Sequence, residues 1–258
     1  MLAGAEALLE GMATSGQPAM RWYVVHERAL ILGASQKPPA VDLAACRAAG
    51  VDVYKRSAGG ATVLIDGDMV GLDIVLPHDD PLLARDLTAS YRWIGEAWRA
   101  ALCALGVDAA LVSVEEARAS THDVSEGARL ARLACFGGLS PYEVTVDTRK
   151  VVGLAQVRRR HGALFQTAVQ LRFDARQMAA LLTVPVADRP ALVAALEDRV
   201  AGLDEVMERP PTDRTYHEIS AAFERALAGH GLAPVDSDWT PAEQDVCVRL
   251  LAERYRPL

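Results

Sequence analysis

Cys135 is the residue whose type and setting most directly suggest covalent chemistry. It lies in residues 134–138 (ACFGG), a glycine-rich stretch that predicts a turn. A thiol in a turn beside basic residues is typical of a cysteine nucleophile, because positive charge favours the thiolate. The alternative is a small buried hydrophobic residue, the commoner role of a free cysteine. The other cysteines lie on predicted helical faces and fit that alternative better: Cys46, Cys103 and Cys247.

Lys150 is one of only three lysines among 27 basic residues, and it precedes the apolar stretch 151–155. A lysine at the start of a strand points either to solvent or into a pocket that the strand floors. In a pocket, its ammonium group can hold an acyl carbonyl or a phosphate where negative charge develops. A solvated hairpin lysine is the alternative.

The segment 55–62 (KRSAGGAT) has the composition of a ligand-binding loop. Its adjacent glycines, Gly59 and Gly60, let the backbone approach a ligand closely and free successive N–H groups for an anion or a carbonyl. Lys55 and Arg56 add charge for a phosphate or carboxylate. The alternative is an ordinary glycine hairpin loop with solvated basic neighbours. The segment is not a P-loop, because the GxxxxGK[ST] pattern is absent and no helix is predicted to follow.

The run 158–161 (RRRH) is a local basic patch in an acidic chain. It suits an acidic partner or a nucleotide phosphate, although such runs are commonly solvated loops. The six histidines form no ligand cluster, and no cysteine belongs to a CxxC or CxxH motif. The sequence therefore predicts no metal site.

Hydrophobic periodicity predicts the elements that position these residues. Strands are expected at 21–32 (two strands around a turn at 26–28), 51–54, 62–65, 69–76, 142–146, 151–156 and 163–173. Two hairpins are expected, one across Asp66-Gly67-Asp68 and one across residues 147–149. Helices are expected at 3–13, 41–49, 87–105, 175–182, 188–201, 215–229 and after Thr240-Pro241. The weakly patterned segment 113–133 is expected to be a mobile surface segment that orders when substrate binds.

Strands precede most helices, which favours an α+β fold with a mixed or antiparallel sheet and packed helices. We expect one domain over 1–258, with a helical C-terminal part at about 175–258. The chain has 51% hydrophobic residues, 24% charged residues and a net charge of −7, values of a folded protein that argue against general nucleic-acid binding. Without a basic start or a long apolar run, we expect neither a secretory signal nor membrane association, and a cytoplasmic location.

The order of these motifs resembles the lipoate–protein ligase family, which includes the cysteine-dependent octanoyltransferases and is related to biotin–protein ligases. The matching pieces are KRSAGGA, then ACF, then RKVVGLAQ at 149–156, then GALFQ at 162–166. The resemblance runs nearly end to end. It implies a class II synthetase-like biotin/lipoate ligase catalytic domain that attaches a lipoyl or octanoyl group to a lysine of a lipoyl carrier domain.

The resemblance also implies roles for particular residues. The family's catalytic lysine falls on Lys150, which would polarise the acyl carbonyl. The octanoyltransferase nucleophile falls on Cys135. The positions implied to bind substrate are Arg56, Ser57, Gly59, Gly60, Ala61, Gly153, Ala155 and Gln156.

Several positions depart from the family pattern. In the loop motif, Lys55 replaces an arginine and Ala61 replaces a glycine. Ile65 replaces a histidine, and Thr167-Ala168 follows Gln166 where the family has His-Gly. The chain also ends about where the family's catalytic domain ends, so the accessory domain of two-domain ligases is expected to be absent, or supplied as a separate chain.

Three functions stay open. The first is ATP-dependent ligation through an activated acyl intermediate, with ATP, magnesium and lipoate or octanoate. The second is Cys135-dependent octanoyl transfer from a thioester. The third is non-catalytic binding of lipoate or of lipoyl domains. The implied partner is a lipoyl carrier domain of the glycine cleavage H protein or 2-oxoacid dehydrogenase E2 type, and no tightly bound cofactor is expected.

Overall fold

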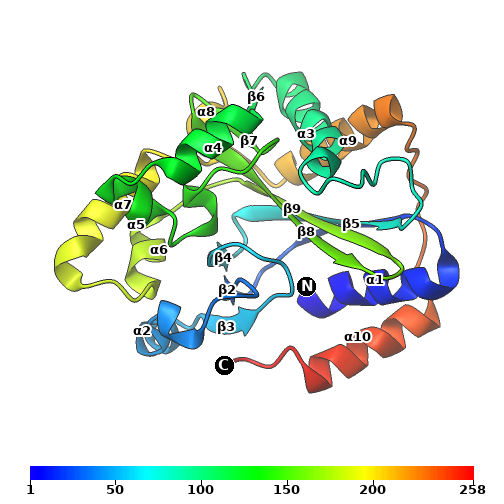
Figure 1. The fold of residues 1–258 in the computed structure, drawn as a ribbon, viewed down its shortest axis with the longest axis horizontal. Helices are drawn as coiled ribbons and strands as arrows, with labels where there is room; N and C mark the ends of the chain where they lie inside the picture. Colours follow the sequence, from blue (N-terminus) through cyan, green and yellow to red (C-terminus); the bar gives the residue numbers. More distant parts are fainter.

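The computed structural model describes residues 1–258 and contains two β-sheets of different size (Figure 1). Every neighbouring pair in the larger sheet is antiparallel. Its strands, in spatial order, are β1 (Ala19–Val24), β5 (Met69–Pro77), β9 (Gly162–Gln170), β8 (Arg149–Arg159), β7 (Val144–Val146) and β6 (Ala110–Leu111).

The smaller sheet is mixed, because its central strand is parallel to one neighbour and antiparallel to the other. Its order is β3 (Asp52–Lys55), β2 (Ala29–Leu32) and β4 (Val63–Ile65). Sheets of this kind with helices packed on them confirm the predicted α+β class.

Ten α-helices surround the sheets. They are α1 (Leu2–Ser15), α2 (Leu43–Ala48), α3 (Arg92–Ala104), α4 (Val114–His122), α5 (Glu126–Ala131), α6 (Ala175–Leu181), α7 (Arg189–Glu197), α8 (Leu203–Val206), α9 (Thr215–Leu227) and α10 (Pro241–Glu253). The expected start of α10 is confirmed: Thr240 accepts a hydrogen bond from the Glu243 N–H, and Pro241 occupies the first turn. No helix is both long enough and apolar enough to cross a membrane.

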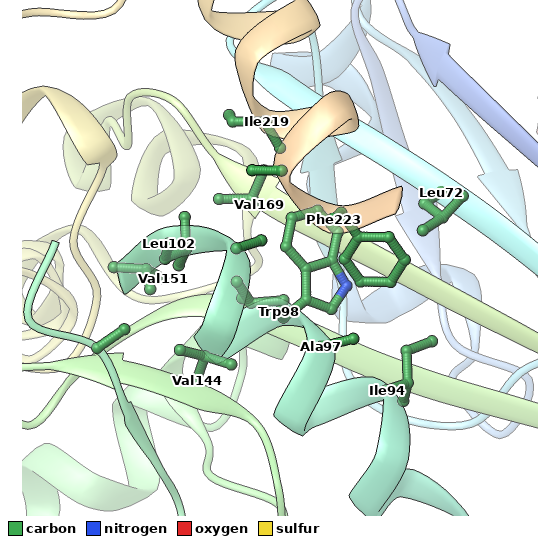
Figure 2. Packing of buried hydrophobic residues seen from close by; sticks show 14 of the residues in the cluster. Leu72, Ile94, Ala97, Trp98, Leu102, Val144, Val151, Val169, Ile219 and Phe223 are labelled. Atoms are coloured by element: carbon green, nitrogen blue, oxygen red, sulfur yellow. The ribbon is translucent and has the colours of Figure 1, made fainter. Parts of the chain in front are cut away.

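The two faces of the larger sheet are covered by different helices. On one face, α3 and α9 bury the rings of Trp98 and Phe223, whose centroids lie 4.7 Å apart (Figure 2). On the other face, α1 packs Leu8, Leu9 and Met12 against β5, β8 and β9. Helix α10 lies along the outer side of α1 (Figure 1). A third cluster joins α2, α5, α6 and α7 to the smaller sheet.

The predicted hairpin across Asp66-Gly67-Asp68 is wrong. Strand β4 pairs with β2, whereas β5 lies between β1 and β9 in the other sheet. The physical reason is burial: residues 69–76 of β5 are all buried, so both of its edges and both of its faces need partners. The turn therefore connects two sheets instead of two strands of one sheet.

Segment 113–133 is also different from the prediction, because it contains α4 and α5. Ser113 and Ser125 accept hydrogen bonds from N–H groups in the first turns of these helices, and Glu116 completes a capping box with Ser113. These caps start helices that hydrophobic periodicity does not reveal.

Helix α3 begins later than predicted. The Asp86 carboxylate accepts the Ala89 N–H and starts a single turn of 3₁₀-helix at Ala89–Tyr91, so the helix proper begins at Arg92 and Leu87 is left exposed. Cys46 is buried as expected, but Cys103 is exposed on α3, because it lies away from the face that packs on the sheet.

Candidate active site

The fold brings the Cys135 turn and the glycine loop together. Cys135 begins a single turn of 3₁₀-helix (Cys135–Gly137) directly after α5. Its N–H donates to the Thr62 carbonyl at 2.7 Å, and its half-buried Sγ lies 3.7 Å from Arg56 Nη2. Thus the two motifs, far apart along the chain, meet as one site.

Arg56 is held in place by its own loop. The residue is only 8% exposed, and its guanidinium donates to the carbonyls of Gly59 at 2.8 Å and Ala61 at 2.9 Å. These bonds fix the cation beside the thiol, where it can stabilise negative charge on sulfur or on an oxygen bonded to the reacting carbon.

Two glycines allow the close packing of this loop. Gly60 has φ +95°, and a Cβ built there would lie 3.5 Å from Cys135 Sγ. A Cβ on Gly33 would lie only 1.9 Å from the Gly60 carbonyl oxygen. Gln36 supports the same contact, because its Oε1 accepts from the Gly33 N–H at 2.9 Å and from Thr62 Oγ1 at 3.1 Å.

Lys150 is buried behind the Cys135 turn, with 1% of its surface exposed. Its ammonium contacts three acceptors: Glu143 Oε1 at 2.7 Å, the Cys135 carbonyl at 3.1 Å and the Gly138 carbonyl at 3.0 Å. The alternative of a solvated hairpin lysine is therefore wrong. Through the two carbonyl contacts, the Lys150 side chain anchors both sides of the cysteine turn.

Glu143 is the partner of Lys150, and the sequence analysis gave it no role of its own. Its carboxylate also accepts the N–H groups of Ser140 at 2.7 Å and Leu154 at 3.2 Å. Burial raises the pKa of Glu143, and the adjacent Lys150 ammonium opposes that rise. The signal in the sequence that points to it is the Tyr142-Glu143 pair, which resembles the Tyr-Glu pair that follows the cysteine in the family pattern.

An apolar cavity opens beside Cys135. Twelve of its sixteen lining residues are hydrophobic, so it suits an aliphatic chain. The lining residues are Met1, Leu2, Tyr23, Ile31, Arg56, Val63, Ile65, Met69, Cys135, Phe136, Gly153, Leu154, Ala155, Gln166, Thr167 and Ala168.

Three of the eight predicted substrate-binding residues line this cavity (Arg56, Gly153 and Ala155), and the other five do not. Side chains alternate along β8, so Ala155 faces the cavity while the Gln156 amide lies on the opposite face, where Arg158 contacts its Oε1. The Ser57 hydroxyl turns toward Glu6, Arg254 and Tyr255. The glycine loop contacts Arg56 instead: the carbonyls of Gly59 and Ala61 accept hydrogen bonds from its guanidinium, and Gly60 packs beside it.

The departures at Ile65 and Thr167 both lie in the cavity wall. Ile65 is 4% exposed and adds an apolar side chain. Thr167 Oγ1 accepts from Trp98 Nε1 at 3.0 Å, so its hydroxyl is satisfied within the protein. Sequence reasoning missed Tyr23, which also lines the cavity and lies across Gly71 on the neighbouring strand.

The basic run 158–161 is split by the structure. The Arg158 guanidinium donates to the Ala84 carbonyl and to Ser90 Oγ, each at 2.6 Å, so it fastens a loop. The next three residues are exposed. No group of three or more histidine, cysteine or acidic side chains gathers as metal ligands do.

Comparison with known proteins places this geometry in a family. The model of the lipoyl protein ligase A/B catalytic domain matches residues 1–226. Octanoyltransferase LipM of Moorella thermoacetica is 30% identical over 86% of this chain and 79% of its own length. Octanoyltransferase LipM of Carboxydothermus hydrogenoformans is 29% identical over 97% of this chain and 89% of its own.

Solved structures share the fold. A bipartite lipoate protein ligase from Thermoplasma acidophilum, described with its E2 lipoyl domain, aligns over 98% of this chain and 86% of its own with a TM-score of 0.76 and 22% identity. A lipoate-protein ligase A bound with ATP aligns over 98% of this chain and 88% of its own with a TM-score of 0.74 and 22% identity. The expected fold is thereby confirmed. The chain belongs to the lipoyl protein ligase A/B catalytic domain family.

Proposed function

We propose that this enzyme transfers an octanoyl group from a thioester donor to a lysine of a lipoyl carrier domain through an acyl-enzyme on Cys135. The observation that carries the proposal is the Cys135 thiol, which lies beside the Arg56 guanidinium and lines an apolar cavity. A cysteine held there presents a nucleophile to the carbonyl carbon while the acyl chain is buried.

The reaction divides into two acyl transfers. First, Cys135 Sγ bonds to the carbonyl carbon of the donor, the donor's C–S bond breaks, and the donor thiol leaves with the proton that Cys135 gave up. Next, the amine of the carrier lysine bonds to the same carbon, the C–Sγ bond breaks, and Cys135 regains a proton from the amine. Neither step consumes ATP.

Arg56 and Lys150 act differently in this scheme. Arg56 stabilises the charge that develops at the reacting centre, since its guanidinium already contacts Sγ. Lys150 fixes the cysteine turn through two backbone carbonyls. It is therefore a positioning residue in this arrangement, and polarising an acyl carbonyl directly requires it to release one of its three acceptors.

The ligase interpretation, which the resemblance put first, has weaker support. The curated relatives named above are octanoyltransferases, and Cys135 has no task in a ligase. The observation that keeps ligation as the second candidate is the shared fold with a ligase that holds ATP. The carrier partner rests on the neighbour described with its E2 lipoyl domain; the glycine cleavage H protein is an expectation from the sequence alone.

Intact-mass analysis tests the proposal. The protein is mixed with octanoyl-acyl carrier protein, without ATP, and then with a lipoyl carrier domain. We expect one octanoyl adduct on the enzyme that passes to the carrier. Cys135→Ala should lose the adduct and reduce transfer by about 10⁴-fold or more, as is usual when a covalent nucleophile is removed.

The matched control is Cys103→Ala, because that thiol is exposed on α3 and lines no part of the cavity. It should transfer at the normal rate. Full activity of Cys135→Ala with ATP and lipoate would favour ligation instead. No modification of any carrier by the unmutated protein, with either donor, would leave the non-catalytic binder.

A further inference from the structure

A second cavity adjoins the first. The two cavities share four lining residues: Met1, Leu2, Ile31 and Ile65. These residues therefore form the partition between the two spaces.

The partition is made of aliphatic side chains. Ile31 comes from β2 and is 2% exposed, and Ile65 comes from β4 and is 4% exposed. Both belong to one packed cluster with Leu2 of α1. Because Ile31 and Ile65 line both cavities, we expect that shortening their side chains would thin the partition without breaking the sheet.

The reacting centre lies on one side of this partition only. Cys135 and Arg56 line the first cavity and not the second. An acyl chain attached to Sγ therefore starts in the first cavity, whose lining includes both isoleucines.

We propose that Ile31 and Ile65 form a wall that limits the length of the acyl chain. The inference rests on the proposed octanoyl transfer and names the residues that select its substrate. A medium-length chain ends at the wall. A longer straight chain has to leave its last methylenes in water or displace the two isoleucines, and both cost binding free energy.

The second cavity is space that a longer chain would enter if the wall were shortened. Val25, Ala29 and Leu251 give that space apolar surface, whereas Glu27, Arg28 and Asp52 line it with charge. The added methylenes would lie in the apolar part next to the wall, because covering the charged groups with a hydrocarbon chain would remove them from water at a cost in free energy.

Chain-length competition tests the wall. Octanoyl and dodecanoyl thioesters of acyl carrier protein are compared as donors for the unmutated enzyme, Ile31→Ala and Ile65→Ala. The unmutated enzyme should prefer octanoyl. In either variant the ratio of kcat/KM for dodecanoyl over octanoyl should rise about tenfold or more, because each methylene that finds an apolar seat is worth about fourfold.

Ile94→Ala is the matched control. It removes the same atoms from a fully buried isoleucine on α3 that lines neither cavity, so stability should fall while the ratio stays unchanged. Folded Ile31→Ala and Ile65→Ala proteins that keep the ratio of the unmutated enzyme would overturn the proposal. If one of the two variants fails to fold, the kcat/KM ratio of the other variant tests the proposal.

A binding measurement separates this inference from the proposed function. Each wall substitution is combined with Cys135→Ser, so that the protein can bind a fatty acid without turning over a donor. Calorimetry then compares the affinities of these double variants for octanoate and dodecanoate. A rise in relative dodecanoate affinity supports the wall even if the protein transfers nothing from a thioester. An unchanged ratio overturns the wall even if transfer is normal.

Discussion

At the scale of single residues, the candidate site separates reacting groups from groups that hold them. Cys135 borders the cavity, whereas Lys150 and Glu143 form an ion pair that is almost completely buried behind it. Removing one member of such a pair leaves an uncompensated buried charge, which is strongly destabilising. A loss of activity on substitution of Lys150 therefore has to be read together with a measurement of folding.

Asp66 gives a prediction on pH dependence. Burial raises its pKa, and the nearby Asp68 and Asp174 carboxylates add to the rise, while the Asp68 N–H and the Arg28 guanidinium oppose it. Between the ordinary carboxyl pKa of about 4 and the raised value, the folded protein holds a proton that the unfolded chain has released, so stability falls as pH rises through that interval. Asp66→Asn keeps an oxygen for the Asp68 N–H but removes the charge.

We expect Asp66→Asn to raise Tm at pH 7. At pH 3 it should leave Tm unchanged, because the Asp66 carboxyl is then protonated in both the folded and the unfolded protein. Thermal unfolding across pH measures the difference. Asp79→Asn, at an exposed carboxylate, is the control and should show no such trend. An equal Tm gain at both pH values would contradict the electrostatic cause.

At the scale of elements, the site depends on how the segment after β2 supports the glycine loop. The Ala34 N–H donates to the Ala58 carbonyl at 2.9 Å, and Gly33 touches the Gly60 carbonyl. Both contacts join backbone atoms, so a change of side-chain rotamer cannot relieve a clash between the two segments.

Gly33→Ala should therefore destabilise the protein by about 2 kcal/mol, the usual size of overpacking in a close-packed region. Denaturant unfolding measures the change. Gly59→Ala is the matched control from the same loop, because a Cβ there meets no atom within 4 Å and its φ is not positive. Similar losses for the two variants would contradict the Gly33–Gly60 contact as the cause.

At the scale of the whole molecule, the C-terminal end of the chain is tied back to the site. Arg254, just after α10, donates to Glu6 Oε2 of α1 and to Ser57 Oγ of the glycine loop, both at 2.8 Å. The Leu258 N–H donates to the Val53 carbonyl at the edge of the smaller sheet. Three distant parts of the chain thus meet on the outer side of the glycine loop.

We expect Arg254→Ala to speed amide hydrogen exchange in residues 56–61 severalfold, because the loop loses its tie to α1 and α10. Exchange followed by mass spectrometry reads this directly. Arg249→Ala removes an arginine within α10 that bonds to Glu10 of α1 but not to the loop, so it should leave these amides unchanged. Equal exchange rates of these amides in the two variants would show that Arg254 does not hold the glycine loop.

The sequence by itself determined the local features of the protein. Hydrophobic periodicity and turn residues located most strands and helices, the Thr240 start of α10, and the hairpin that presents Lys150. Residue chemistry singled out Cys135, Lys150 and the glycine loop, all of which the fold brings together. Such features are readable because propensity, capping and residue chemistry act over a few neighbouring positions.

Only the tertiary structure decided how these pieces pair. It separated β4 from β5 into two sheets, converted 113–133 into capped helices, gave Lys150 the Glu143 carboxylate, and turned Ser57 and Gln156 away from the cavity. Strand partners, ion pairs and cavity walls depend on residues that are distant along the chain. Their selection follows from which arrangement buries the most apolar surface while satisfying every buried polar group, and that is a property of the whole chain.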